Sequence, residues 1–234
     1  MSHPFYSTQP KNPLPLDRGS LIDKSEWIPL FCAGKNVLNL GAAGHPCTEF
    51  SATHGRHLHL ILSKVAKTIS GIDLDRESLD YLTAKHNAIG LVCGNAERLL
   101  EYFPEKSFDV VVAGDVIEHV NNMGLLMESS ASVLRDGGTM IVTVPNTYGI
   151  KRIIAFLLLR TEFCHPDHVC YYSPMNFVQI ASRFGFEIVE MKSFMISKEN
   201  HRRNNLGNRF SAIIQWLFRN HWLADEIAVV LRKR

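Results

Sequence analysis

Two short segments of the chain carry residue types that can hold a nucleoside. Residues 37–44 read Val-Leu-Asn-Leu-Gly-Ala-Ala-Gly, an apolar strand followed by a turn of small residues, and residues 70–75 read Ser-Gly-Ile-Asp-Leu-Asp. Small residues let a ligand approach the backbone without meeting a Cβ atom. Asp73, at the end of the second strand, can accept hydrogen bonds from both hydroxyls of a ribose. The two segments predict a nucleoside-binding crevice at the carboxyl edge of a parallel sheet.

An alternation of strands and helices would bring these two segments to one edge. Apolar β-rich runs recur between helical segments, which is typical of right-handed crossovers in a doubly wound parallel sheet. Gly137 and Gly138 are expected to end a helix at residue 134. The expected strands are 36–40, 68–72, 91–94, 108–113, 139–144, 186–196 and 226–231, and the expected helices are 20–31, 56–67, 76–88, 125–134, 173–184 and 209–219.

Three segments do not follow this alternation. Residues 1–20 are rich in proline and polar side chains, which predicts an N-terminal arm before one domain at 21–234. Residues 146–172 show no repeating period and hold an apolar patch with histidines and cysteines. Residues 197–224 resemble an insertion. We expect 146–175 and 197–224 to shape a second binding region beside the nucleoside crevice.

The composition excludes several classes of protein. With 234 residues, 46% of them hydrophobic and 21% charged, the chain has ordinary globular composition. A net charge of +2 gives no reason to expect nucleic-acid binding. Five cysteines without framework spacing predict reduced thiols and a cytoplasmic location. No signal peptide is evident at residues 1–6, and no apolar run is long enough to span a bilayer.

In this order the segments resemble the class I S-adenosylmethionine-dependent methyltransferases, closely over about residues 35–145 and more loosely to the C-terminus. Gly41 matches the family's acid-x-Gly-x-Gly-x-Gly motif, while Ala43 replaces the second glycine and Asn39 replaces the acid. The resemblance implies a Rossmann-like seven-stranded α/β sheet with an antiparallel last strand, and S-adenosyl-L-methionine as cofactor. The cofactor contacts that it implies come from Asn39, Gly41, Ala42, Gly44, Asp73, Leu74, Asn95, Ala96, Gly114 and Asp115. For Asp73 and Asn95 the alternative role is a helix cap.

Residues 108–120 give the sharpest match to the family. There Gly114 and Asp115 would lie beside the sulfonium, and Glu118-His119 resembles a pair common in small-molecule methyltransferases. His168 begins a His-Val-x-x-x-Ser-Pro segment that often lines the acceptor pocket. An imidazole, with a pKa near 6.5, suits removal of a proton from an acceptor oxygen. His119 and His168 are therefore the predicted bases, although each could instead form a structural hydrogen bond in its loop.

The resemblance implies methyl transfer, and we favour an oxygen of a small molecule, a sugar or a lipid-linked compound as the acceptor. The alternatives are transfer to nitrogen and a non-catalytic binding subunit with the same fold. A dehydrogenase is disfavoured, because residues 41–46 lack the Gly-x-Gly-x-x-Gly spacing that seats a pyrophosphate on a helix N-terminus.

The sequence does not favour a resident metal ion. Zinc could use Cys164, His165, His168 and Cys170, but their spacing is not that of a usual zinc site. The turn at 115–119, with Asp115, Glu118 and His119, resembles the Glu-x-x-Glu-His turn of ubiquinone-pathway O-methyltransferases, where a divalent ion has been proposed. Neither alternative outweighs the expectation that the site contains no metal.

One amphipathic helix, at 209–219, has an apolar face and arginines at both ends. In one interpretation, this face packs as a lid on the acceptor pocket or against another subunit at an interface. The other interpretation is peripheral contact with the inner face of a membrane, with basic residues at the headgroups and Trp216 at the boundary. A lipid-linked acceptor would be consistent with the second interpretation.

Overall fold

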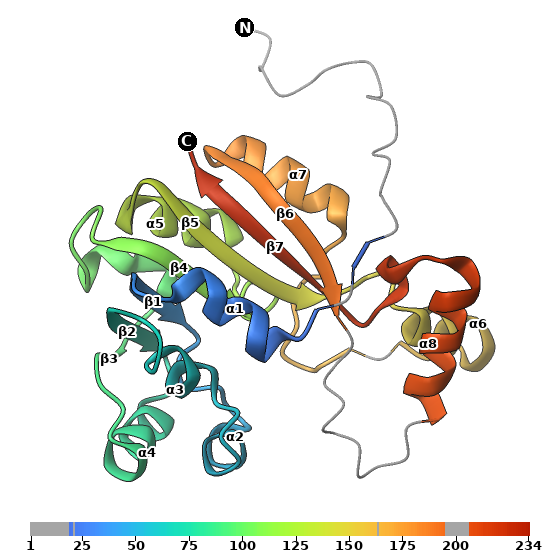
Figure 1. Cartoon of the computed structure of the whole chain (residues 1–234), viewed down its shortest axis with the longest axis horizontal. Helices are drawn as coiled ribbons and strands as arrows, with labels where there is room; N and C mark the ends of the chain where they lie inside the picture. The colour runs from blue at the N-terminus through green and yellow to red at the C-terminus, as the bar shows by residue number, and fades with distance from the viewer. Residues whose placement is uncertain (1–18, 21, 163, 195–205) are drawn as a thin grey trace, which may run out of the picture.

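Strands that alternate with helices along the chain form one seven-stranded sheet in the order β3-β2-β1-β4-β5-β7-β6 (Figure 1). The computed structural model describes residues 19–20, 22–162, 164–194 and 206–234. Strands β1 to β5 pair in parallel, and β7 runs antiparallel to both of its neighbours, β5 and β6. The predicted fold class is confirmed. The strands are β1 (Asn36–Leu40), β2 (Thr68–Asp73), β3 (Leu91–Cys93), β4 (Phe108–Gly114), β5 (Leu134–Pro145), β6 (Phe186–Phe194) and β7 (Glu226–Lys233).

Helices cover both faces of the sheet, so the central strands are buried on both sides and read as continuous apolar runs. In β4, Val111 packs with α5 and α7 on one face, while Val110 and Val112 pack with α1 and α3 on the other. The α-helices are α1 (Lys24–Cys32), α2 (Thr48–Thr53), α3 (Leu58–Leu62), α4 (Arg76–His86), α5 (Met123–Val133), α6 (Ile150–Leu159), α7 (Pro174–Arg183) and α8 (Leu206–Phe218), and the 3₁₀ helices are η1 (Ala96–Glu101) and η3 (His221–Leu223).

The strand order reverses between β1 and β4. From β1 the chain moves outward to β2 and β3, then returns to place β4 on the other side of β1. Ligands of open α/β sheets bind outside the carboxyl ends of the strands at such a switch point. The turns that follow β1 and β4 therefore border the expected crevice.

Three sequence-based expectations about elements are wrong. Residues 150–159 form α6, because an almost unbroken apolar run hides the helical period without preventing a helix. The helix expected at 56–67 is only α3, and α2 precedes it, with Gly55 in a left-handed turn between them. Gly137 and Gly138 do not end α5. They lie at the start of β5, where Phe108 pairs with Leu134 and Val110 pairs with Thr139, which is a bulge.

The structure describes only part of the predicted N-terminal arm and of the predicted insertion at 197–224. Residues 1–18 and 195–205, which hold most of the predicted arm and part of the predicted insertion, lie outside the described residues. The rest of the insertion forms α8 and η3, and α8 contacts α6 beyond the carboxyl end of β5 (Figure 1). Among the described residues no helix has the length and apolar character needed to cross a bilayer.

Candidate cofactor and acceptor site

The turn after β1 has the backbone that a close ligand requires. Gly41 has a φ of +67°, in the left-handed region, and a Cβ at this position would lie 2.6 Å from Cγ2 of Val116. The Ala42 amide donates to the carbonyl oxygen of Ile72 at 3.1 Å, which joins the turn to β2. Gly44 also has a positive φ, +66°. The turn is therefore tight, and it lies against the end of the strand that carries Asp73.

Asp73 is held in place by two backbone amides. The Ala43 amide donates to Oδ2 and the Asp75 amide donates to Oδ1, both at 2.9 Å. Each carboxylate oxygen keeps a second lone pair for a ligand hydroxyl. The cap of α4 is Asp75, whose Oδ1 accepts from the Ser78 amide at 3.2 Å. Asp73 therefore does not cap this helix, and its half-buried carboxylate is positioned at the sheet edge.

The segment 94–96, which holds the predicted cofactor contacts Asn95 and Ala96, begins beside Asp73. The Gly94 amide donates to the carbonyl oxygen of Asp73 at 2.8 Å. Asn95 does cap a helix, since its Oδ1 accepts from the Glu97 amide at 2.8 Å, but that oxygen also keeps a second lone pair. Leu74 is 72% exposed, although leucine is a large apolar residue. An apolar side chain next to the acid that is predicted to bind ribose suits the flat surface of a base.

Asn39 is the deepest polar residue of the predicted cofactor set. It is 1% exposed near the carboxyl end of β1, and its Oδ1 has no hydrogen-bond partner among the described residues. A buried carbonyl oxygen without a partner costs about 1–3 kcal/mol. Such an oxygen is suited to accept a hydrogen bond from a bound ligand.

Acidic side chains surround the end of β4. Asp115 has a φ of +55°, which is unusual for a residue with a side chain. Its carboxylate forms an ion pair with Nζ of Lys24 and accepts from Oγ1 of Thr143 at 2.8 Å. Lys24 Nζ lies 3.9 Å from Oε2 of Glu226. These three residues, Asp115, Glu226 and Lys24, form what we call the acidic floor of the predicted crevice. It combines carboxylates from two strand ends with a lysine from α1.

Glu118 and Glu226 are held in surroundings that favour their neutral forms. Burial, reinforced by the charge of Asp115, raises the pKa of Glu118 to about 8. Burial and Asp115 raise the pKa of Glu226 to about 8 as well, although Lys24 opposes that shift. Both carboxyl groups can therefore be protonated near neutral pH without a bound cation, and a cation in the crevice would favour their ionised forms.

We expect the Glu226→Gln variant to lose part of the pH dependence of stability. Between about pH 4.5 and pH 8 the folded chain binds a proton at Glu226 that the unfolded chain releases, so the free energy of unfolding falls as pH rises. Glutamine cannot titrate. At pH 8.5 the free energy of unfolding of the variant should exceed that of the native chain by up to about 4 kcal/mol, since each unit of pKa shift corresponds to about 1.4 kcal/mol.

Denaturant unfolding at pH 5 and pH 8.5 measures this difference. At pH 5 the two proteins should be nearly equal, because Glu226 is then neutral. The facing groups Asp115, Lys24, Glu118 and Asp225 are the same in both proteins. A less stable variant at pH 8.5 would show instead that the ion pair with Lys24 dominates.

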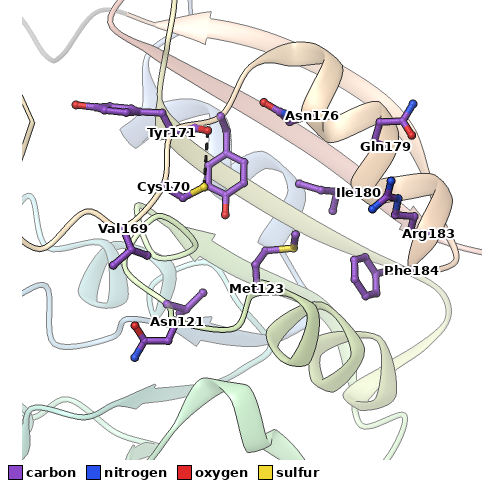
Figure 2. A pocket seen from close by; sticks show the side chains of 12 residues that line it. Asn121, Met123, Val169, Cys170, Tyr171, Asn176, Gln179, Ile180, Arg183 and Phe184 are labelled. Carbon is purple, nitrogen blue, oxygen red and sulfur yellow. Dashed lines mark hydrogen bonds between the residues drawn. The ribbon is translucent and has the colours of Figure 1, made fainter. Parts of the chain in front are cut away.

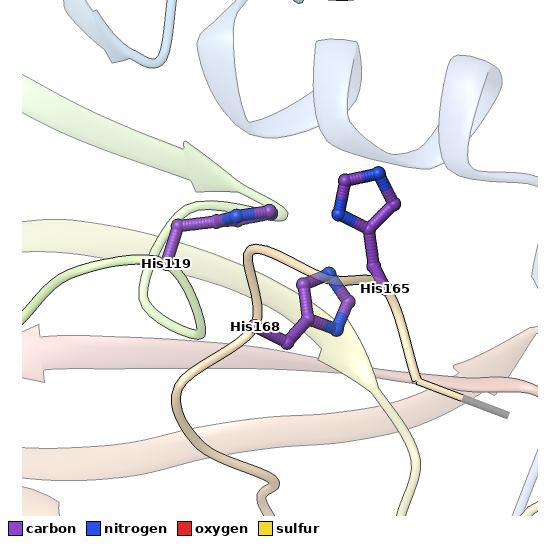
Figure 3. A group of neighbouring side chains, drawn as sticks. All are labelled: His119, His165 and His168. Carbon is purple, nitrogen blue, oxygen red and sulfur yellow. The ribbon is translucent and has the colours of Figure 1, made fainter. Parts of the chain in front are cut away.

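Histidines from two loops converge beside this acidic floor. The ring centroids of His119 and His168 are 4.5 Å apart, and His165 lies 5.3 Å from His168 and 5.9 Å from His119 (Figure 3). The Val169 amide donates to the carbonyl oxygen of Glu118 at 2.8 Å, which fastens one loop to the other. Burial, together with the charges that His119 and His165 would carry, lowers the pKa of His168. His168 is therefore favoured as a neutral imidazole.

A cavity of about 580 Å³ adjoins the histidines. Val120 and Val169, the residues directly after His119 and His168, both line it. In Figure 2, Ile180 and Arg183 of α7 lie on one side, Val169 and Cys170 lie on the other, and Met123 lies between them. This volume is typical of small-molecule pockets.

The structure brings most of the predicted site residues to one edge. Gly41, Ala42, Asp73 and Asn95 follow adjacent strands, and Asp115 follows β4 across the switch point. Sequence reasoning missed Lys24 and Glu226, which lie far apart in the chain and in no motif. One sequence clue was available for Glu226, since an acid at the first position of an otherwise apolar strand is unusual.

A Rossmann-like sheet with a glycine turn at its switch point and an acid at the next strand end defines the class I methyltransferase fold. The chain belongs to the family of methyltransferase domains, whose model matches residues 27–191. A probable S-adenosylmethionine-dependent methyltransferase from Mycolicibacterium smegmatis is 29% identical over 157 residues, 67% of this chain and 54% of the relative. A ubiquinone biosynthesis O-methyltransferase from Bradyrhizobium diazoefficiens is 26% identical over 141 residues, 53% of this chain and 54% of the relative.

Solved structures support the fold. A methyltransferase from Archaeoglobus fulgidus that depends on S-adenosylmethionine superposes with a TM-score of 0.59, at 19% identity, over 88% of this chain and 90% of that chain. The chain spans about half the length of the two relatives from Mycolicibacterium smegmatis and Bradyrhizobium diazoefficiens.

The family implies S-adenosyl-L-methionine as cofactor, and the residues at the switch point fit its chemistry. The cofactor carries an ammonium and a sulfonium, which are both cationic. Burial favours the neutral forms of Glu118 and Glu226, and a cationic ligand would stabilise their ionised forms. The same ligand could donate a hydrogen bond to Oδ1 of Asn39, which has no partner among the described residues.

Proposed function

We propose that this protein transfers a methyl group from S-adenosyl-L-methionine to an oxygen of a small molecule, a sugar or a lipid-linked compound. One observation carries the choice of oxygen: the rings of His119 and His168 lie 4.5 Å apart, and the residue after each of them lines a cavity of about 580 Å³. An oxygen acceptor must lose a proton, and an amine need not. Two of the relatives with similar sequences are named as ubiquinone biosynthesis O-methyltransferases.

The residues of the chain have simple tasks in this reaction. The cofactor supplies an electrophilic methyl group on its sulfonium. Asp73 and Asn39 hold the cofactor, and Asp115 places negative charge near the sulfonium. His119 or His168 takes the proton of the acceptor hydroxyl while that oxygen bonds to the methyl carbon. The bound cofactor would supply the methyl group and keep the electron pair of the carbon–sulfur bond on sulfur, so the residues of the chain need only align the acceptor and remove its proton.

The assay that tests this function supplies S-adenosyl-L-methionine with a labelled methyl group to lipid and water-soluble extracts. We expect label in a product whose mass spectrum locates the new methyl on oxygen. A methyl on nitrogen would contradict the choice of acceptor atom. Failure to bind millimolar cofactor in calorimetry would favour the non-catalytic alternative.

We expect His168→Ala to lower the methyl-transfer rate by about 10²- to 10⁴-fold, the usual contribution of proton transfer to a positioned side chain. Affinity for the cofactor should change little. The matched control is His54→Ala, an exposed histidine at the end of α2 whose Nδ1 contacts the carbonyl oxygen of Phe50. A loss below tenfold would indicate an acceptor that needs no base.

We further propose that the acceptor is presented at a lipid surface through the α6–α8 face, defined here as residues 156–159 and Ile213, Trp216, Leu217 and Phe218. Each of these large apolar side chains is between 61% and 77% exposed. The two helices that carry these side chains contact each other, so the exposed apolar residues lie on neighbouring elements. An exposed apolar surface of this kind marks a binding site.

The orientation of α8 supports a lipid partner. Its polar residues Ser211 and Gln215 are buried, 0% and 1% exposed, and Gln215 Nε2 donates to Ser211 Oγ at 3.1 Å. The apolar side of the helix therefore faces outward. Segments 150–160 and 206–219 contain arginines or lysines and no acid. Apolar side chains with basic neighbours and a tryptophan are typical of helices that lie on anionic membranes.

A further inference from the structure

We infer that His119, His165 and His168 form a binding site for one divalent transition metal ion of the zinc class. One ligand nitrogen from each ring lies within 4.8 Å of the others. In a tetrahedral zinc site, with bonds of about 2.0–2.1 Å, neighbouring nitrogens are about 3.3 Å apart. Closing the remaining distance requires only small rotations of side chains, two of which are exposed.

The loops hold the rings in positions that suit a metal. His165 Nδ1 lies 3.7 Å from Oδ2 of Asp167, a carboxylate placed to accept the Nδ1 proton when Nε2 binds an ion. His168 Nδ1 is buried and has no hydrogen-bond partner among the described residues. The bond from the Val169 amide to Glu118 fixes the distance between the two loops. The imidazoles converge as shown in Figure 3.

The ligand set is distinct from both metal sites considered from sequence. Asp115 is paired with Lys24 and Thr143. Within the described residues, Cys164 and Cys170 do not join the histidine group, and each contacts a backbone carbonyl of its own loop instead. Three nitrogen ligands without a thiolate leave a coordination position open, as in catalytic zinc sites.

The open coordination position would give the three histidines a function beside the cavity. A hydroxyl bound there would coordinate the ion, which lowers the pKa of bound oxygen groups. Because the ion would occupy the lone pairs of His119 and His168, the acceptor proton would pass to water in place of either ring, and the coordinated oxygen would attack the methyl carbon. This role rests on the proposed O-methyl transfer. Metal binding itself does not.

The test is titration of the chelator-treated full-length chain with Zn²⁺ by calorimetry, and with Co²⁺ by visible absorption. We expect one equivalent to bind, with the visible bands of nitrogen-ligated Co²⁺. His165→Ala should weaken Zn²⁺ binding at least 100-fold, and the control His54→Ala should not change it. Because His165 is 44% exposed at its side chain, its removal should not prevent folding.

A second measurement is thermal unfolding, in which Zn²⁺ should raise the Tm of the native chain and of His54→Ala but not of His165→Ala. Equal binding by native and His165→Ala proteins, or no binding at all, would overturn the inference. Methyl transfer that persists in chelator would contradict the role of the ion in the reaction, while leaving the proposed function intact with a free imidazole as base. Zn²⁺ binding without methyl transfer would support the metal site and contradict the proposed function.

Discussion

The Asp73→Asn variant is expected to bind S-adenosyl-L-methionine about 10- to 100-fold more weakly than the native chain. Hydrogen bonds to a charged group contribute about 1.5–3 kcal/mol, and the ribose hydroxyls would lose a carboxylate acceptor. The remaining lone pairs of Asp73 are already aimed at the crevice, because two backbone amides fix both of its oxygens. Isothermal calorimetry measures the change.

The matched control is Asp75→Asn, which removes the same charge two residues away. Asp75 caps α4 and interacts with Ser78, so this change should lower the Tm slightly and leave cofactor affinity almost unchanged. Asp73→Asn should also lose some stability, because its amide nitrogen cannot accept from a backbone N–H. If both variants bound the cofactor as tightly as the native chain, Asp73 would not contact it.

The double variant Leu158→Glu with Trp216→Glu is expected to bind lipid vesicles at least 100-fold more weakly than the native chain. Burial of each large apolar side chain contributes about 1.5–3 kcal/mol, and a carboxylate is repelled by anionic headgroups. Both side chains are more than three-quarters exposed, so the folded chain should tolerate the changes. Co-sedimentation with vesicles of phosphatidylcholine and phosphatidylglycerol measures binding.

The matched control is Leu30→Glu on α1, where the leucine is 75% exposed, almost the same as Leu158 at 76%. This variant should bind vesicles as the native chain does. Native protein that fails to bind vesicles but sediments as a dimer, with the double variant monomeric, would identify the α6–α8 face as a subunit interface. That result would contradict the membrane proposal.

Much of the cofactor half of the site could be predicted from local sequence. Strands buried on both faces must be apolar throughout, so β1, β2, β4 and β5 are recognisable as short apolar runs. A parallel sheet places the carboxyl ends of its strands at one edge, so Gly41 and Asp73 had to be neighbours once the alternation was recognised. The Ser173 cap with Pro174 likewise fixed the start of α7.

Other elements could not be predicted, because their local patterns were ambiguous. The apolar run in α6 has no visible period, and periodicity alone does not separate a buried strand from a helix in such a run. The glycines at 137–138 suit a helix end and a bulge equally well, and only their pairing with β4 decides between the two. Which face of α8 points outward also depends on neighbouring elements.

The sequence by itself determined the order of strands and helices, the switch-point turn and the acid beside it, because each depends on residues close together in the chain. Only the tertiary structure decided that Lys24 of α1 and Glu226 of β7 meet Asp115, and that His165 joins His119 and His168. These residues are brought together by the packing of α1 on the sheet, by the return of β7 beside β5 and by one hydrogen bond between two loops. Such contacts depend on long-range geometry, which no short stretch of sequence records.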